Sequence, residues 1–205
     1  MEKETVRMEG FSDAIFAIAI TLLVLDLHVP ESVDGNIDLG AYLKEQWPAF
    51  LAFTISFFSI FIMWVNHHKL FKQIYSRNTA ITFANGLTLF FVTAVSYPTA
   101  LLSKFFTGPS ANVAVAVYTG LFVLINLSYN LLWYVAARNK ELLRPGISDQ
   151  AINKIKKNYL YGLPTYCIAF GLSFQYPDIA LVICIALWIY WAFSSGKIHQ
   201  DEFAE

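Results

Sequence analysis

Long apolar runs separated by short polar segments dominate this chain. Six runs are long enough to cross a bilayer, because a spanning helix needs about 20 mostly apolar residues. We place them at about residues 7–29, 42–71, 79–102, 112–137, 159–174 and 178–195. The pattern therefore predicts an all-α membrane protein with six transmembrane helices in a single domain, residues 1–205.

Turn-forming residues mark the boundaries between these runs. Proline lacks a backbone N–H and glycine is conformationally free, so both tend to end helices. Such residues separate the predicted spans at Pro30, Gly108-Pro109, Arg144-Pro145-Gly146 and Tyr176-Pro177-Asp178. Pro98 and Pro164 fall within or at the ends of spans, where neighbouring helices can satisfy the freed carbonyl groups.

The composition agrees with a membrane protein. Hydrophobic residues make up 57% of the chain and charged residues 14%, whereas a soluble domain carries about 45–50% and about 25%. The net charge of -1 gives no indication of nucleic-acid binding. Cys167 and Cys184 lie in apolar stretches, so we expect buried or lipid-facing thiols rather than a disulfide or a zinc site.

Basic residues are distributed unevenly between the predicted loops. If the N-terminus is cytoplasmic, only Lys44 and Lys104 of the 14 lysines and arginines fall on the outer side. Cytoplasmic loops are enriched in these residues, so the asymmetry predicts that both termini are cytoplasmic. The cytoplasmic set is Lys3, Arg7, Lys69, Lys72, Arg77, Arg138, Lys140, Arg144, Lys154, Lys156, Lys157 and Lys197.

The predicted outer side is acidic. Around a pore, acidic loops would raise the local cation concentration, but such loops equally keep an outer surface hydrated. The acidic residues on this side are Asp26, Glu31, Asp34, Asp38, Glu45 and Asp178.

The first span has two different faces. An α-helix advances about 100° per residue, which places Ile18, Leu22 and Leu25 at the centre of an apolar stripe and Thr21 at its edge. Asp13 lies on nearly the opposite side. A stripe of this kind on an arbitrary transmembrane helix can simply face lipid or another helix.

The polar side of the first span contains Ser12 and Asp13 near its inner end. An ionisable residue inside a membrane is costly unless it is paired or faces water. The second span places Trp64, Asn66 and His67 at a matching depth. We therefore expect a buried hydrogen-bond network that joins Ser12 and Asp13 to this cluster and holds the first helix in place.

The histidines allow other interpretations. His67 and His68 could both lie at the membrane interface beside Lys69, His68 more readily than His67. Adjacent residues on a helix face different directions, so this pair is a poor metal site. No nucleophile, base and orienting residue share one depth, and no phosphate loop or metal-ligand motif is present, so we expect no enzyme.

The N-terminal residues carry a recognisable motif. Residues 7–13 match the pattern Arg-x-x-x-Phe-Ser-Asp through Arg7, Phe11, Ser12 and Asp13, and an apolar run follows directly. The motif resembles the signature of the transmembrane-protein-175 family, the potassium channels of animal endolysosomes and their bacterial relatives. Segment 64–68, Trp-Val-Asn-His-His, is similar to that family as well.

The resemblance implies a channel. Animal members carry two six-helix repeats and bacterial members one, so this chain is expected to form a homotetramer in a bacterial inner membrane. The first helix of each subunit would line a central pore, with the family's constricting positions at Ile18, Leu22 and Leu25. The motif around Ser12 and Asp13 is expected to be structural. The family lacks the usual potassium filter loop, and this chain has no Thr-Val-Gly-Tyr-Gly segment.

The expected activity is passive, potassium-permeable cation conduction. A narrow hydrophobic constriction blocks hydrated ions by dewetting. Thr21 falls where some bacterial relatives place a threonine ring facing the ion; alternatively, its hydroxyl bonds to its own helix one turn back. Permeant potassium is the expected ligand, with no cofactor and no structural metal.

Three other functions are rivals to the channel. A proton-coupled transporter or proton pathway would use Asp13, Asp26, His67 and His68, but no ionisable residue lies between Asp13 and Asp26 to continue a relay. A membrane enzyme would need a catalytic constellation. A structural scaffold without ion flux is the third.

Overall fold

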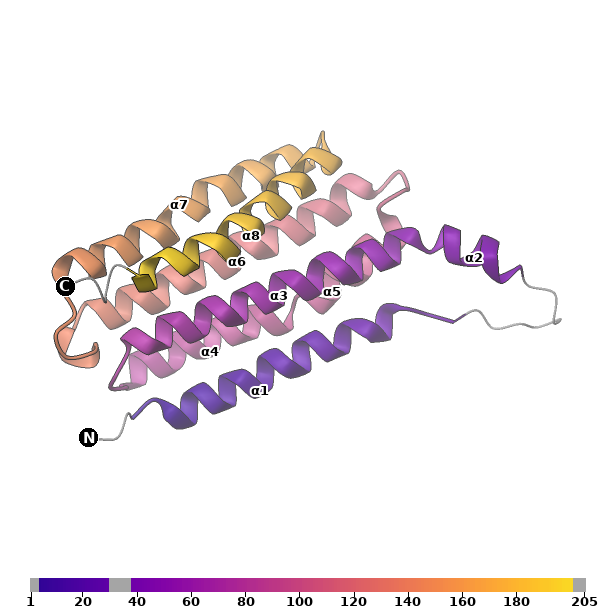
Figure 1. Ribbon diagram of the computed structural model, residues 1–205. Coiled ribbons are helices and arrows are strands. Elements are labelled where there is room, and N and C mark those ends of the chain that lie inside the picture. Colours follow the sequence, from indigo (N-terminus) through magenta and orange to yellow (C-terminus); the bar gives the residue numbers. More distant parts are fainter. Residues whose placement is uncertain (1–3, 30–37, 201–205) are drawn as a thin grey trace.

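Long helices lying side by side form the structure, and α2 extends beyond one end of the bundle (Figure 1). The computed structural model describes residues 4–29 and 38–200, with side chains up to residue 193. Lys3, Pro30, Glu31 and Asp34 lie outside the described residues, as does the side chain of Lys197. The helices are α1 Val6–Leu22, α2 Leu39–Glu45, α3 Trp47–Gln73, α4 Thr79–Thr93, α5 Ser96–Phe105, α6 Ala111–Ala137, α7 Asp149–Ser173 and α8 Pro177–Gln200.

Within the described residues, four helical stretches are long and apolar enough to cross a membrane. They are Val6–Asp26, Trp47–Gln73, Thr79–Phe105 and Ala111–Ala137. α8 contributes a shorter apolar stretch, Pro177–Phe193, and α7 begins with a charged segment. The prediction of a mostly helical membrane protein is therefore confirmed, and each predicted run falls on a helix.

The first two predicted spans are not single α-helices. The first tightens after Leu22 into a 3₁₀ turn, Leu23–Asp26, and Leu27 is extended. The second divides into α2, which Asp38 caps by accepting from the Gly40 and Ala41 amides, and α3. Proline in the first turn of α3 costs no hydrogen bond, because the first amides of a helix have no intrahelical partner.

The third predicted span is interrupted between α4 and α5. The break lies at Ala94 and Val95, just before Pro98, which has no N–H to bond the Ala94 carbonyl four residues back. The Tyr97 amide bonds to that carbonyl instead, across 3.2 Å. The Thr99 hydroxyl donates to the Val95 carbonyl at 2.8 Å. A proline kink and local readjustment therefore explain a break that the apolar pattern alone conceals.

The fifth predicted span was too short. α7 begins at Asp149 rather than near residue 159, and the Ser148 hydroxyl caps it by accepting from the Ala151 amide at 3.1 Å. Ile152 and Ile155 are buried, so the first turns pack against the bundle although Lys154, Lys156 and Lys157 lie among them. In the first turns of α7 the apolar residues keep a helical spacing although the mean hydropathy is low. A search for long apolar runs therefore misses these turns.

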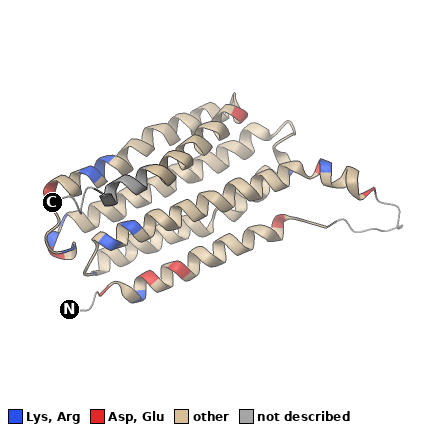
Figure 2. Ribbon diagram, viewed as in Figure 1, with Lys and Arg blue, Asp and Glu red and all other residues tan. Residues whose placement is uncertain are grey.

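α6 occupies the centre of the bundle and packs against α4, α5, α7 and α8, while α1 packs against α3 and α4. Figure 2 shows Lys and Arg gathered mainly at the end of the bundle where α1 begins. At that end the loop after α3 joins the loop after α6, because the Tyr75 amide donates to the Leu142 carbonyl and the Arg144 amide to the Gln73 carbonyl, both at 2.8 Å.

Candidate pore-lining helix

α1 lies at the edge of the bundle and buries one face only (Figure 1). Met8, Ser12, Phe16, Ala19 and Leu23 form this buried face. Their spacing of three or four residues brings them onto one side of a helix. α1 is therefore attached to α3 and α4 through this side, and the other described residues leave its opposite side uncovered.

The predicted apolar stripe lies on the free side. Ile18 is 56% exposed, Leu22 46% and Leu25 69%. Apolar side chains at membrane depth can face lipid or another helix without penalty, since helix association in lipid depends on packing. The stripe is therefore available to contact lipid or further subunits.

The 3₁₀ turn changes the geometry of the stripe at its outer end. Side chains three residues apart eclipse one another in a 3₁₀ helix, so Leu25 lies more directly above Leu22 than an α-helix would place it. The advance of about 100° per residue that was assumed for the whole first span therefore does not hold beyond Leu22. The two leucines form adjacent layers along the helix.

Thr21 is exposed, and its hydroxyl donates to the Ile18 carbonyl across 2.9 Å. This bond to its own helix is the alternative that the sequence left open. The hydroxyl oxygen keeps lone pairs after donating its proton. The bond therefore orients the oxygen of Thr21 and leaves it able to accept.

The buried side-chain carboxamide of Asn85, on α4, links α1 to α3 on the attached side of α1. His67 Nε2 donates to Asn85 Oδ1 at 2.7 Å, and Asn85 Nδ2 donates to Ser12 Oγ at 3.0 Å. Ser12 in turn donates to the Met8 carbonyl at 2.8 Å. Ser12, His67 and Asn85 are each at most 2% exposed, so the chain of bonds runs through the core between α1, α3 and α4.

Aromatic rings enclose His67. Its ring centroid lies 4.5 Å from that of Phe71 in a stacked arrangement and 5.3 Å from that of Phe16. Tyr129 meets it edge-on at 6.4 Å. His67 is thus packed inside the subunit, whereas His68 is exposed.

Asp13 takes a different place from the one expected. Trp64 Nε1 donates to Asp13 Oδ1 at 2.8 Å, but Asp13 is exposed in the single chain. Trp64 also stacks against the ring of His68. The expected partners are found in two separate parts: Ser12 reaches His67 through Asn85 in the core, and Asp13 bonds to Trp64 at the surface of α1 and α3.

The remaining motif residues are dispersed. Arg7 and Phe11 are exposed on α1, with Phe11 63% exposed. Asn66 lies beside residues of α6, α7 and α8, and its backbone carbonyl accepts from the Tyr159 hydroxyl at 3.5 Å. Asn66 is consequently separated from the Ser12 network, although it is adjacent to His67 in sequence.

Asn85 is the functional-site residue that sequence reasoning missed. Its signal was available, because a carboxamide inside an apolar span is costly without a partner. Among the described residues, no three histidines, cysteines or acids are placed to hold a metal ion.

Comparison with known proteins identifies the family to which the chain belongs. The family model for the endosomal/lysosomal potassium channel TMEM175 matches residues 7–95. A potassium channel of Chamaesiphon minutus is 42% identical over 196 residues, which cover 95% of this chain and 97% of that protein. The chain belongs to the TMEM175 family. Membership in this channel family confirms the resemblance drawn from Arg7 to Asp13.

Solved and animal TMEM175 proteins extend the comparison. The crystal structure of a lysosomal potassium-selective channel TMEM175 homolog from Chamaesiphon minutus superposes with a TM-score of 0.82 at 41% identity, covering 93% of this chain and 97% of that one. The human endosomal/lysosomal proton channel TMEM175 is 27% identical over 97% of this chain, which spans only 39% of the human protein.

Proposed function

We propose that this chain is one subunit of a potassium-permeable cation channel that conducts passively. The observation that carries the proposal is the division of α1 into an attached face and an exposed apolar stripe. Ile18, Leu22 and Leu25 are 46% to 69% exposed, while Ser12 on the other side is tied to α4. One face of α1 is bonded to the rest of the subunit, and the opposite face exposes apolar side chains. Such a helix is suited to line an axis shared with other copies of the chain.

The assembly proposed is a homotetramer of six-span subunits. Four copies of α1 would surround a central pore, and the stripe of each would face its counterparts rather than lipid. The close likeness to a potassium-selective TMEM175 homolog over nearly the whole chain supports this arrangement. The basic end of the bundle would lie in the cytoplasm of a bacterial cell, with both termini there.

The mechanism proposed is gating by a hydrophobic constriction. Rings of Ile18, Leu22 and Leu25 would exclude water when narrow and admit ions when the four helices move apart. Potassium would pass more readily than sodium because the larger ion gives up its hydration shell at lower cost. Thr21 oxygens, oriented by the bond to Ile18, would offer acceptors to a partly dehydrated ion beside the constriction.

Proton permeation is the second candidate function. Animal TMEM175 relatives are named proton channels, so protons could pass through the same central pore. A relay within one subunit is less well supported, because Asp13 and Asp26, the ionisable residues nearest the stripe, are separated along the helix by residues 14–25, none of which is ionisable.

Ion flux from vesicles that contain the purified protein tests the channel. We expect potassium to leave faster than sodium under matched gradients, without saturation and without an imposed pH gradient. Protein-free vesicles provide the baseline, and a pH-sensitive dye in parallel samples reports protons. Flux that saturates and needs a pH gradient would replace the channel with a transporter, and no flux at all would leave a scaffold.

A further inference from the structure

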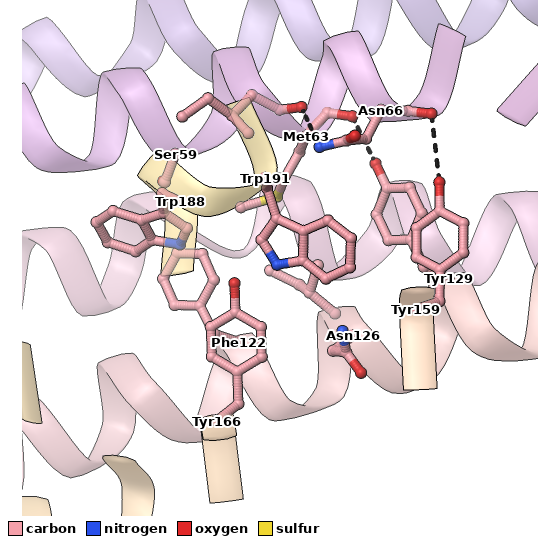
Figure 3. A pocket seen from close by; sticks show the side chains of 12 residues that line it. Ser59, Met63, Asn66, Phe122, Asn126, Tyr129, Tyr159, Tyr166, Trp188 and Trp191 are labelled. Carbon is pink, nitrogen blue, oxygen red and sulfur yellow. Dashed lines mark hydrogen bonds between the residues drawn. The ribbon is translucent and has the colours of Figure 1, made fainter. Parts of the chain in front are cut away.

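The first turns of α7 carry lysines on the side of the helix that faces away from the bundle. Ile155, Tyr159 and Tyr166 are buried on the inner side, and Figure 3 shows Tyr159 and Tyr166 pointing from α7 into the bundle. An advance of about 100° per residue places Lys157 directly opposite these three residues. The packing of α7 therefore holds this lysine outward.

Lys156 and Lys157 carry charges that the described residues do not neutralise. Both side chains are exposed, and no ion pair reaches either of them within the described part of the chain. Asp149, in the first turn of the same helix, pairs with Lys140 instead. Figure 2 shows this basic stretch of α7 at the end of the bundle where α1 begins. A negatively charged partner from outside the chain can therefore reach both lysines.

The exposed side of α7 changes from basic to apolar within about one turn. Leu160 follows Lys156 by four residues and Tyr161 follows Lys157 by four, so each pair lies on one side of the helix. Leu160 is 51% exposed, Tyr161 67% and Ile168, two turns further on, 57%. Tyrosine is enriched where a spanning helix meets the headgroup layer. In the six-span subunit proposed above, the two lysines therefore lie at the level of the lipid headgroups.

α6 shows the same order of exposed residues, and α6 packs against α7. Leu127, Leu131 and Tyr134, three or four residues apart, are 41% to 57% exposed. Arg138 follows one turn later and is also exposed. On both helices the exposed side chains pass from apolar through tyrosine to basic towards the same end of the bundle. The two helices therefore agree on where the hydrocarbon layer ends.

We propose that Lys156 and Lys157 bind the phosphate of an anionic phospholipid in the leaflet at the basic end of the bundle. Basic residues beside a membrane attract lipids of net negative charge, whereas the phosphate of a zwitterionic lipid is already balanced by its own cationic group. An acyl chain would lie along Leu160 and Ile168, with the Tyr161 hydroxyl at the level of the glycerol. A soluble anion would use the lysines alone, so the neighbouring apolar residues favour a lipid.

Native mass spectrometry of the full-length protein in detergent tests the site without measuring conduction. Phosphatidylglycerol and phosphatidylcholine with identical acyl chains would be added in equal amounts. We expect phosphatidylglycerol to bind in preference, and its tightest binding to weaken roughly tenfold in the double variant Lys156→Gln/Lys157→Gln. The control, Lys44→Gln/Lys104→Gln, removes the same charge from the predicted outer side and should bind as the unchanged protein does.

Two outcomes of this experiment would overturn the lipid site. One is equal binding of the two lipids, and the other is equal binding of phosphatidylglycerol by the two double variants. Binding and conduction are measured separately. A protein that prefers phosphatidylglycerol through these lysines but conducts no ions would therefore support the lipid site and refute only the channel.

Two further measurements separate a lipid site from a site for any anion. Leu160→Asn keeps both lysines but removes an apolar contact, so phosphatidylglycerol should bind more weakly. Val113→Asn is the control, because Val113 is 56% exposed near the start of α6; equal binding by both variants would refute the acyl-chain contact. Displacement of the lipid by sodium phosphate, but not by sodium chloride of equal ionic strength, would show a plain anion site and overturn the lipid assignment.

Discussion

At the scale of single residues, polar side chains divide α1 between attachment and exposure. Ser12, Asn85 and His67 satisfy one another inside the core through bonds of 3.0 Å or less. Burying such groups is tolerable only when each has a partner. The orientation of the helix therefore depends on a carboxamide from α4 as much as on the motif that α1 carries.

Asn85→Leu tests this attachment. The change leaves Ser12 and His67 without their shared partner, and an orphaned buried polar group costs about 1–3 kcal/mol. We expect the melting temperature in detergent to fall. Thr93→Val is the control, because its exposed hydroxyl bonds only to the Phe90 carbonyl of its own helix. If both variants melt alike, the Asn85 bridge contributes nothing to stability.

Ile18→Ser and Leu22→Ser test the proposed constriction. A polar ring keeps water where an apolar ring excludes it, so resting potassium flux into vesicles should rise in both variants. Val24→Ser is the matched control, since Val24 is 51% exposed but lies off the stripe. Unchanged flux in Ile18→Ser and Leu22→Ser would remove these residues from the gate.

Thr21 supports a separate prediction about selectivity. Thr21→Val keeps the shape of the side chain but removes the oxygen, whereas Thr21→Ser keeps the oxygen. If the oxygen faces the ion, the ratio of potassium to sodium flux should fall in the valine variant and persist in the serine variant. Equal ratios in both would mean that the hydroxyl serves only its bond to Ile18.

At the scale of helices, the C-terminal pair is held to α6 by a close approach at Gly162. A Cβ added there would meet Asn126 Nδ2 at 2.7 Å and Trp191 at 2.9 Å. Real Cβ atoms do not approach so closely, so a larger residue at this position would force Asn126, Trp191 or α7 itself to shift. This glycine is required by packing and not by backbone conformation.

Gly162→Ala should therefore destabilise the subunit. Overpacking a tight core costs about 1–3 kcal/mol, which a thermal melt in detergent would detect. Gly171→Ala on the same helix is the control, because nothing lies within 4 Å of its added Cβ. Alanine has the higher helix propensity, so that variant should be neutral or slightly stabilised. A stable Gly162→Ala protein would show that α7 moves freely relative to α6.

At the scale of the whole molecule, the exposed stripe of α1 has a definite consequence for assembly. We expect the purified protein to have a mass in detergent of four times the 23.2 kDa of one chain, after correction for bound detergent. Light scattering combined with absorbance separates the two contributions. A monomer that still conducts potassium would place the pore within one subunit and exclude the arrangement around α1.

The sequence by itself determined the family, the apolar runs and the two faces of α1. These features follow from local patterns. Hydrophobic periodicity and the Arg-x-x-x-Phe-Ser-Asp motif can be recognised in the sequence without knowledge of how the helices pack. The exposed positions of Ile18, Leu22 and Leu25 were predictable for the same reason. The break before Pro98 was suggested by the proline itself, although the apolar pattern runs through it.

Only the tertiary structure decided which polar residues meet. Ser12 and His67 are joined by Asn85, which lies 73 residues from Ser12, and Asp13 separates from them although it is the neighbour of Ser12. Neighbours on a helix point about 100° apart, so contact depends on how α1, α3 and α4 are rotated against one another.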